Sequence, residues 1–160
     1  MRDNKLRSLW AANKKAVNGW LAIPDSFAAE VMALQGYDTL TIDLQHGLID
    51  TRVLVPMLQA IQSTPTMPMV RVPWLEPGVI MKTLDAGAQA LICPMVNTRE
   101  EAQRLVQYAR YAPLGARSFG PVRAGLVHGA DYAEAANADT VVFAMIETAQ
   151  ALDNLDAICS

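Results

Sequence analysis

The chain has 160 residues, of which 52% are hydrophobic and 18% charged, a composition typical of a globular α/β protein. Its formal net charge of -3, with scattered Lys and Arg, argues against nucleic acid as a partner, and no apolar run approaches the roughly 20 residues that span a bilayer. The polar opening lacks the apolar core of a secretory signal, so we expect a cytoplasmic protein without a membrane contact. Cys93 and Cys159 have no metal-binding spacing and are predicted to be buried free thiols.

Short apolar runs alternate with segments of helical periodicity along the chain. An amphipathic segment over 6–17 comes first and is expected to lie outside the sheet. The apolar runs predicted to be strands cover 17–23, 39–45, 67–72, 90–96 and 141–148. Helices are predicted between them, each opening at a capping residue, over 25–35, 50–62, 76–86 and 98–109. Strands buried on both faces and alternating with helices indicate a parallel sheet with right-handed crossovers.

Two architectures fit this alternation: an open, doubly wound sheet of flavodoxin type and the first part of a (β/α)8 TIM barrel. Residues 149–160 begin another helix without a Gly or Pro to end it, which favours the barrel. Complete barrels have about 250 residues. We therefore expect one partial TIM-barrel domain over 1–160, with a leading helix in 1–16, about five βα units from residue 17 onward, and the C-terminal units absent.

Polar residues that the strand pattern does not need stand at the ends of three predicted strands. Asp43 and His46 end the second, Arg71 the third and Glu147 the fifth. In either architecture these ends meet at one edge of the sheet, where catalytic groups gather. Burying such charges is costly unless they pair or bind a ligand, so they indicate either a site or a structural ion pair of Arg71 with Asp43 or Glu147. His46 by itself is equally typical of a surface histidine.

Several short motifs follow one another along the chain: Asp-Leu-Gln-His-Gly at 43–47, Val-Arg-Val-Pro at 70–73, Leu-Asp-Ala-Gly at 84–87, Pro-Met-Val at 94–96, Arg-Tyr-Ala-Pro-Leu-Gly-Ala-Arg-Ser-Phe-Gly at 110–120 and Ile-Glu-Thr at 146–148. In this order they resemble the HpcH/HpaI aldolase family, the class II pyruvate aldolases of the 4-hydroxy-2-oxoheptanedioate type. The resemblance extends from about residue 23 to the last residue.

This resemblance implies a (β/α)8 barrel that reversibly cleaves a 4-hydroxy-2-oxo acid to pyruvate and an aldehyde. It also implies a divalent metal, Mg²⁺ or Mn²⁺ with Co²⁺ as a further option, and a homo-oligomer, a hexamer in this family. The implied roles are base for His46, stabiliser of enolate charge for Arg71 and metal ligand for Glu147, in agreement with Lewis-acid and electrostatic catalysis. A Schiff-base mechanism is disfavoured, because the lysines do not end a predicted strand. They are Lys5, Lys14, Lys15 and Lys82.

The resemblance leaves alternatives at several positions. It gives Asp85 the role of raising the basicity of His46, but the end of the third helix lies at the opposite end of a barrel from the mouth. Asp85 could therefore reach His46 only from another subunit, and Asp43 is the alternative partner within one subunit. Met145 stands where some family members have a substrate-contacting Gln, and it cannot donate a hydrogen bond. The second metal carboxylate that the resemblance implies follows a sixth strand, beyond Ser160.

Two other functions also fit these residues. One is a related lyase acting on another 2-oxo acid, such as an oxaloacetate decarboxylase. The other is an inactive, truncated remnant that only packs with a partner. Two further expectations concern the stretch after the fourth helix. The segment 117–120 could close over the site, but a Gly-containing loop of this kind is more typical of a simple turn. His128 has no partner pattern and is predicted to be exposed.

Overall fold

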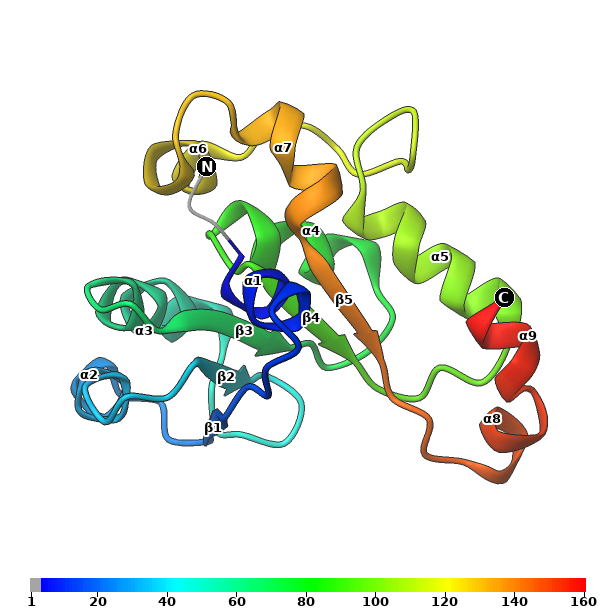
Figure 1. Cartoon of the computed structure of the whole chain (residues 1–160), viewed down its shortest axis with the longest axis horizontal. Coiled ribbons are helices and arrows are strands. Elements are labelled where there is room, and N and C mark those ends of the chain that lie inside the picture. The colour runs from blue at the N-terminus through cyan, green and yellow to red at the C-terminus, as the bar shows by residue number, and fades with distance from the viewer. Residues whose placement is uncertain (1–3) are drawn as a thin grey trace.

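The computed structural model describes residues 4–160, and its central feature there is a five-stranded parallel sheet in the order β1-β2-β3-β4-β5 (Figure 1). The strands are β1 (Asn18–Leu21), β2 (Thr39–Asp43), β3 (Met67–Arg71), β4 (Ala90–Cys93) and β5 (Val141–Ala144). The helices are α1 (Lys5–Ala11), α2 (Ser26–Ala33), α3 (Thr51–Gln62), α4 (Pro77–Asp85), α5 (Arg99–Ala109), α6 (Val122–His128), α7 (Tyr132–Asp139), α8 (Ala149–Asp153) and α9 (Leu155–Cys159).

The strand order decides between the two predicted architectures. In the flavodoxin type the chain reverses direction across the sheet and the order is 2-1-3-4-5. Here each strand pairs with the next one in sequence, as in a barrel. The prediction of a partial (β/α)8 barrel is therefore confirmed, and the flavodoxin alternative is wrong.

The predicted elements are present with shorter bounds, and two helices were not predicted. Each predicted strand extends past its observed end into a loop at the mouth; β5, for example, ends at Ala144, before Glu147. The capping residues used to place α2 to α5 do accept hydrogen bonds from the first turns of these helices. By contrast, α6 follows Pro121, which has no capping side chain, and Asp131 at the start of α7 makes no side-chain cap hydrogen bond.

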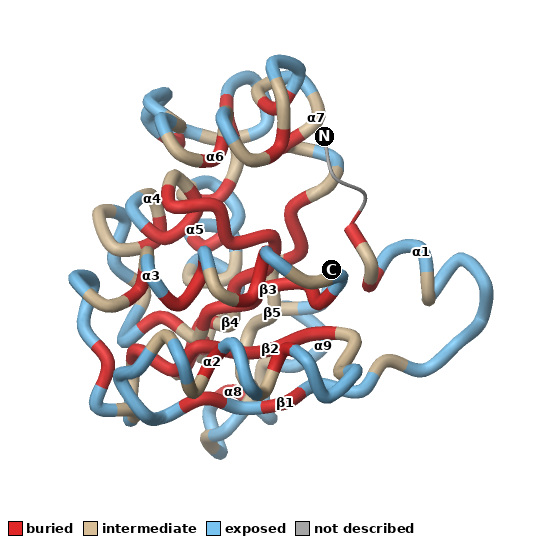
Figure 2. The backbone as a smooth tube through the Cα atoms, turned by 90° about the vertical axis from the view of Figure 1, so that its left-hand side faces the viewer, coloured by how far each residue is buried: buried red, intermediate tan, exposed pale blue. Residues whose placement is uncertain are grey.

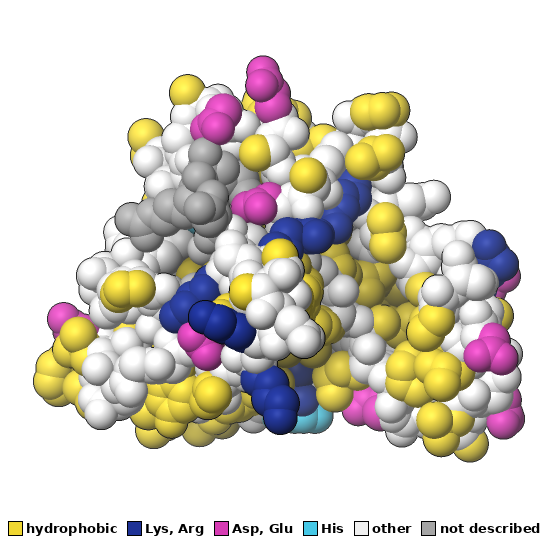
Figure 3. Space-filling model, viewed as in Figure 1, with side chains coloured by type: hydrophobic (Ala, Val, Ile, Leu, Met, Phe, Trp, Pro, Cys, Tyr) yellow, Lys and Arg dark blue, Asp and Glu magenta, His cyan; other side chains and the backbone are white. Residues whose placement is uncertain are grey.

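The two faces of the sheet have different cores. Ile42 and Val70 point to the larger core, which α2 to α5 cover. Met67 and Met69 belong to a second cluster on the opposite face, the inner face of the barrel, where Leu6 of α1 packs with them. Figure 1 shows α1 in front of the sheet, and Figure 2 shows that most of β2 and β3 is buried. Beside β5, hydrophobic side chains line a hollow that is visible from solvent in Figure 3. The inner face is thus closed by α1 only in part.

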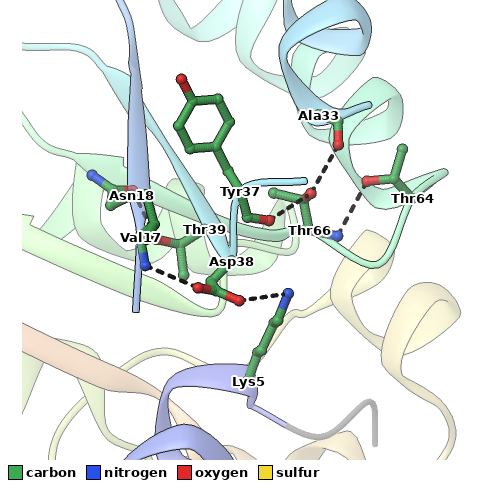
Figure 4. A network of polar contacts seen from close by, with 9 residues as sticks. All are labelled: Lys5, Val17, Asn18, Ala33, Tyr37, Asp38, Thr39, Thr64 and Thr66. Atoms are coloured by element: carbon green, nitrogen blue, oxygen red, sulfur yellow. Dashed lines mark hydrogen bonds and ion pairs between the residues drawn. The ribbon is translucent and has the colours of Figure 1, made fainter. Parts of the chain in front are cut away.

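Polar contacts attach α1 to the N-terminal ends of the strands, opposite the mouth. Lys5 Nζ lies 3.0 Å from Asp38 Oδ1, and the N–H group of Val17 donates to Asp38 Oδ2 at 2.9 Å (Figure 4). Asn4 Nδ2 donates to the carbonyl of Gln89 at 3.1 Å. The hydrogen bond from Val17, with the help of Lys5, lowers the pKa of Asp38. These contacts keep α1 beneath the sheet and away from the strand ends that carry the candidate site.

Some expectations outside the sheet were wrong. Cys93 is buried as predicted, but Cys159 is exposed on the surface of α9. His128 is buried rather than exposed, because its ring stacks on Tyr132 of α7, a helix that the prediction lacked. In the described part of the chain, no helix has the length and apolar character needed to cross a membrane.

Candidate active site

The register of β2 and β3 brings Asp43 and Arg71 together. The two residues are paired across the strands, so their side chains leave the same face of the sheet at its C-terminal edge. Arg71 donates from Nε to Asp43 Oδ1 at 2.9 Å and from Nη2 to Asp43 Oδ2 at 2.6 Å. This two-point geometry is the strongest form of an arginine–carboxylate pair and holds the guanidinium in one plane. The predicted ion pair therefore forms with Asp43.

Trp20 of β1 completes this cluster, and the sequence analysis missed it. Its indole Nε1 donates to Asp43 Oδ2 at 3.3 Å, and the Arg71 guanidinium carbon lies 4.8 Å from the centre of its ring. A cation over the face of an indole is attracted by the negative face of the ring. Period-two alternation in β1 could have indicated this residue, since Trp20 is paired with Thr41, two residues before Asp43 on the same face.

The cluster keeps both of its charged groups ionised. Burial alone would raise the pKa of Asp43, but the hydrogen bonds from Arg71, from the His46 N–H group and from Trp20 hold it well below its usual range. The hydrogen bond to Asp43 raises the pKa of Arg71 against the effect of burial, and the charge of Glu147 raises it further. Arg71 is thus a permanent positive charge, and Glu147 is near enough to interact with it.

His46 lies in the loop after β2 with an exposed side chain. Asp43 Oδ1 accepts hydrogen bonds from the backbone N–H groups of Gln45, at 3.0 Å, and His46, at 3.2 Å. Asp43 therefore fixes the main chain of His46 and not its imidazole ring. Gly47 is required in this turn, because a Cβ atom there would lie 2.3 Å from the carbonyl oxygen of Asp43. The loop presents the imidazole to solvent at the mouth.

Glu147 is the acidic residue at the end of the fifth βα unit that can hold a metal. Its Oε1 accepts a hydrogen bond from the N–H group of Met95 at 2.8 Å, while Oε2 has no hydrogen-bond partner among residues 4–160. No three His, Cys, Asp or Glu side chains gather into a metal site within the described residues. Magnesium sites commonly use one or two carboxylates together with substrate oxygens and waters. Glu147 fits the part of one such carboxylate.

Asp85 and Met145 are the other predicted site residues. Asp85, at the C-terminal end of α4, lies away from the mouth, and its Oδ1 accepts from Arg117 Nη2 at 2.6 Å. Arg117 is fully buried and also donates to Tyr132 Oη at 3.1 Å. The contact with Asp85 holds the start of the 117–120 segment at the end of the sheet away from the mouth. Met145 follows β5 directly, and its N–H group donates to the carbonyl of Cys93 at 2.9 Å.

Some of the predicted site residues thus lie at the same end of the sheet, and others do not. At the C-terminal edge of the sheet are an imidazole, a fixed guanidinium and a carboxylate with an unused oxygen, from His46, Arg71 and Glu147. Asp85 is not among them. Such a set can remove a proton, stabilise negative charge on an oxygen and contribute one ligand to a cation. These three groups suit a reaction in which a base removes a proton and negative charge then develops on an oxygen atom.

Comparison with known proteins assigns the chain to a family. A family model described as HpcH/HpaI aldolase/citrate lyase matches residues 19–160. A hydroxypyruvate/pyruvate aldolase of Rhizorhabdus wittichii is 46% identical over 98% of this chain and 62% of its own length. A 5-keto-4-deoxy-D-glucarate aldolase of Escherichia coli is 34% identical over the same shares of the two chains, 98% and 62%.

A solved structure gives the same result. The crystal structure of an HpcH/HpaI aldolase/citrate lyase family protein from Burkholderia cenocepacia matches with a TM-score of 0.89 and 34% identity, over 97% of this chain and 64% of the other. The chain spans about 62% of the length of the curated relatives that it matches. The sequence motifs, the sequential parallel strands and these matches agree, and the chain belongs to the HpcH/HpaI aldolase/citrate lyase family.

Proposed function

We propose that the protein is a class II pyruvate aldolase, which reversibly cleaves a 4-hydroxy-2-oxo acid to pyruvate and an aldehyde. The observation that carries this proposal is the fixed guanidinium of Arg71 at the strand ends. Asp43 and Trp20 hold it in place, and the negative charge of Glu147 lies near enough to interact with it. Both curated relatives are aldolases by name, which supports the same reaction class. Because one of them is a hydroxypyruvate/pyruvate aldolase, pyruvate and hydroxypyruvate are the nucleophiles to test first.

His46 and Arg71 divide the proposed chemistry between them. In cleavage, His46 takes the proton of the 4-hydroxyl group, the C3–C4 bond breaks, and its electron pair forms the pyruvate enolate as the aldehyde leaves. Arg71 stays protonated and donates a hydrogen bond from Nη1 to the enolate oxygen, since Nε and Nη2 are engaged by Asp43. The imidazolium then returns the proton to C3, which yields pyruvate and a neutral His46. Condensation is the reverse.

Glu147 is the residue that would hold a divalent metal, Mg²⁺ or Mn²⁺, with its Oε2. When bound, such a cation acts as a Lewis acid on the 2-oxo acid. Nothing in this scheme needs a Schiff base, and the lysines lie on α1, α4 and the α1–β1 connection, away from the C-terminal strand ends that carry the site. Because Asp85 lies at the other end of the sheet, it can act on His46 only between copies of the chain. A homo-oligomer, a hexamer by family resemblance, is therefore part of the proposal.

The test is condensation of pyruvate with a small aldehyde by the purified protein in the presence of Mn²⁺, with the products identified. His46→Ala should lower kcat by about 10²- to 10⁴-fold, the range for loss of a general base. Arg71→Lys keeps the charge but loses the planar fork, and we expect a loss of about 10²-fold. Arg104→Lys is the matched control, since Arg104 is 53% exposed on α5 and should leave the rate unchanged.

The products decide between this function and a related lyase. Decarboxylation of oxaloacetate without any aldol condensation would replace the proposed function with the alternative one. Activity that survives both exhaustive chelation and His46→Ala would refute the mechanism. A protein that catalyses neither reaction would leave only the packing role that the sequence analysis considered.

A further inference from the structure

The orientation of Glu147 depends on a peptide group with unusual backbone geometry. Met95, in the β4–α5 loop, has a φ of 57°, in the left-handed region that non-glycine residues rarely adopt. It is the N–H group of this residue that donates to Glu147 Oε1 at 2.8 Å. A backbone conformation of this kind persists only where the surroundings enforce it. The contacts of this loop identify the group that enforces it.

The side chain of Asn97 contacts Met95, the donor of this hydrogen bond, and Thr148, the neighbour of the acceptor Glu147. Its Nδ2 donates to the carbonyl oxygen of Met95 at 2.9 Å, on the side of the loop that carries the strained residue. Its Oδ1 accepts a hydrogen bond from the hydroxyl of Thr148, the residue directly after Glu147. One amide thus ties the loop after β4 to the loop after β5, on either side of the Met95–Glu147 contact.

The main chain of Asn97 is fixed as well. Its N–H group donates to Glu101 Oε2 at 2.7 Å, and its carbonyl oxygen accepts from Asn154 Nδ2 at 2.9 Å. Each hydrogen-bonding group of Asn97, in the backbone and in the side chain, therefore has a partner. These hydrogen bonds hold the Asn97 side chain in one position, and a side chain that orients another residue must itself be fixed in this way.

We propose that Asn97 is a positioning residue for Glu147. It holds the Met95 peptide and Thr148 so that Oε1 of Glu147 is occupied by the Met95 N–H group and Oε2 points to the site of a divalent cation. This inference rests on the proposed function for the role of Glu147 as a metal ligand, and it adds the group that sets the direction of that ligand. Outer groups that orient a metal ligand influence affinity strongly, and their loss typically weakens metal binding about 10- to 100-fold.

The experiment compares Asn97→Ala and Asn97→Leu with Thr98→Ala. Thr98 is the N-cap of α5 and accepts from the N–H group of Glu101 at 3.2 Å, so its loss perturbs the same loop without touching Met95 or Thr148. Binding of Mn²⁺ alone is measured by electron paramagnetic resonance, and hydrogen exchange of the Met95 amide by NMR without metal. Both Asn97 variants should raise the Kd for Mn²⁺ about 10-fold and speed exchange of the Met95 amide; Thr98→Ala should do neither.

The outcomes separate this inference from the function on which it rests. Unchanged Mn²⁺ affinity and Met95 exchange in the Asn97 variants would overturn the positioning role and leave the aldolase proposal intact. An equal loss of affinity in Thr98→Ala would also overturn it, since the effect would then come from general loosening of the loop. If the parent protein binds no Mn²⁺, the role of Glu147 as a metal ligand and the positioning role of Asn97 both fall, whereas the aldolase proposal is decided separately by its condensation assay. Asn97→Leu keeps a side chain branched at Cγ but removes the amide, so unfolding of Asn97→Ala would not remove the test.

Discussion

Replacing Asp43 by Asn removes the charge of the carboxylate that holds the candidate site together. The carboxylate accepts two hydrogen bonds from Arg71, one from the indole of Trp20 and two from backbone N–H groups. The Asp43 side chain is 4% exposed and that of Arg71 13%. Removing one partner of a buried pair costs about 3–5 kcal/mol, and because Arg71 keeps some contact with water we expect the lower value, about 3 kcal/mol.

The assay is urea unfolding at pH 7, where a loss of about 3 kcal/mol lowers the midpoint by about 1.5 M for an m-value of about 2 kcal/mol per M. Asp38→Asn is the matched control, because it makes the same chemical change in a more exposed ion pair with Lys5. The side chain of Lys5 is 33% exposed and that of Asp38 is 23% exposed. Exposed pairs contribute about 0–1 kcal/mol. Equal losses for the two variants, or a loss below about 1 kcal/mol for Asp43→Asn, would refute the reasoning.

Three further predictions follow from the same geometry. The pKa of Asp43 is lowered in the folded state, so its contribution to stability is complete above about pH 5 and is lost as pH falls through the unfolded value of about 3.9. In urea titrations, the stability difference between the parent and Asp43→Asn should therefore stay constant from about pH 5 to pH 8 and narrow below about pH 4. Trp20→Phe keeps an aromatic ring under the Arg71 guanidinium, whereas Trp20→Ala removes it. The kcat for condensation should therefore be about tenfold lower in Trp20→Ala than in Trp20→Phe, and equal kcat values would contradict a role for the cation–π contact. Gly47→Ala should displace the loop of His46 and reduce condensation, while Gly120→Ala, where a Cβ atom meets nothing within 4 Å, should be neutral in the same assay.

Much of the fold could be predicted because its signals are local. Alternating apolar runs located the strands, and N-cap residues located α2 to α5, since both depend on residues a few positions apart. The helices α6 and α7 were not predicted: α6 follows Pro121, which has no capping side chain, whereas Asp131 at the start of α7 is a residue type that could have indicated that helix. The burial of His128 followed from the same omission, as its ring packs on Tyr132 of α7.

The candidate site was predictable as a set of residues but not as an arrangement. Polar residues at strand ends pointed to His46, Arg71 and Glu147, because the C-terminal ends of parallel strands share one edge. The sequence left open whether Arg71 pairs with Asp43 or with Glu147. The β2–β3 register decided for Asp43, since it places the two residues side by side.

The sequence by itself therefore determined the class of fold, the edge of the sheet that carries the site, and the family to which the chain belongs. Tertiary structure alone decided which groups touch: Trp20 beneath Arg71, the Met95 N–H group on Glu147, and Arg117 on Asp85. The physical reason is one of distance along the chain. Periodicity and capping act within a few residues. The Arg117–Asp85 and Met95–Glu147 contacts join residues 32 and 52 positions apart, and the contact of Trp20 with Arg71 depends on the registers of β1 with β2 and of β2 with β3.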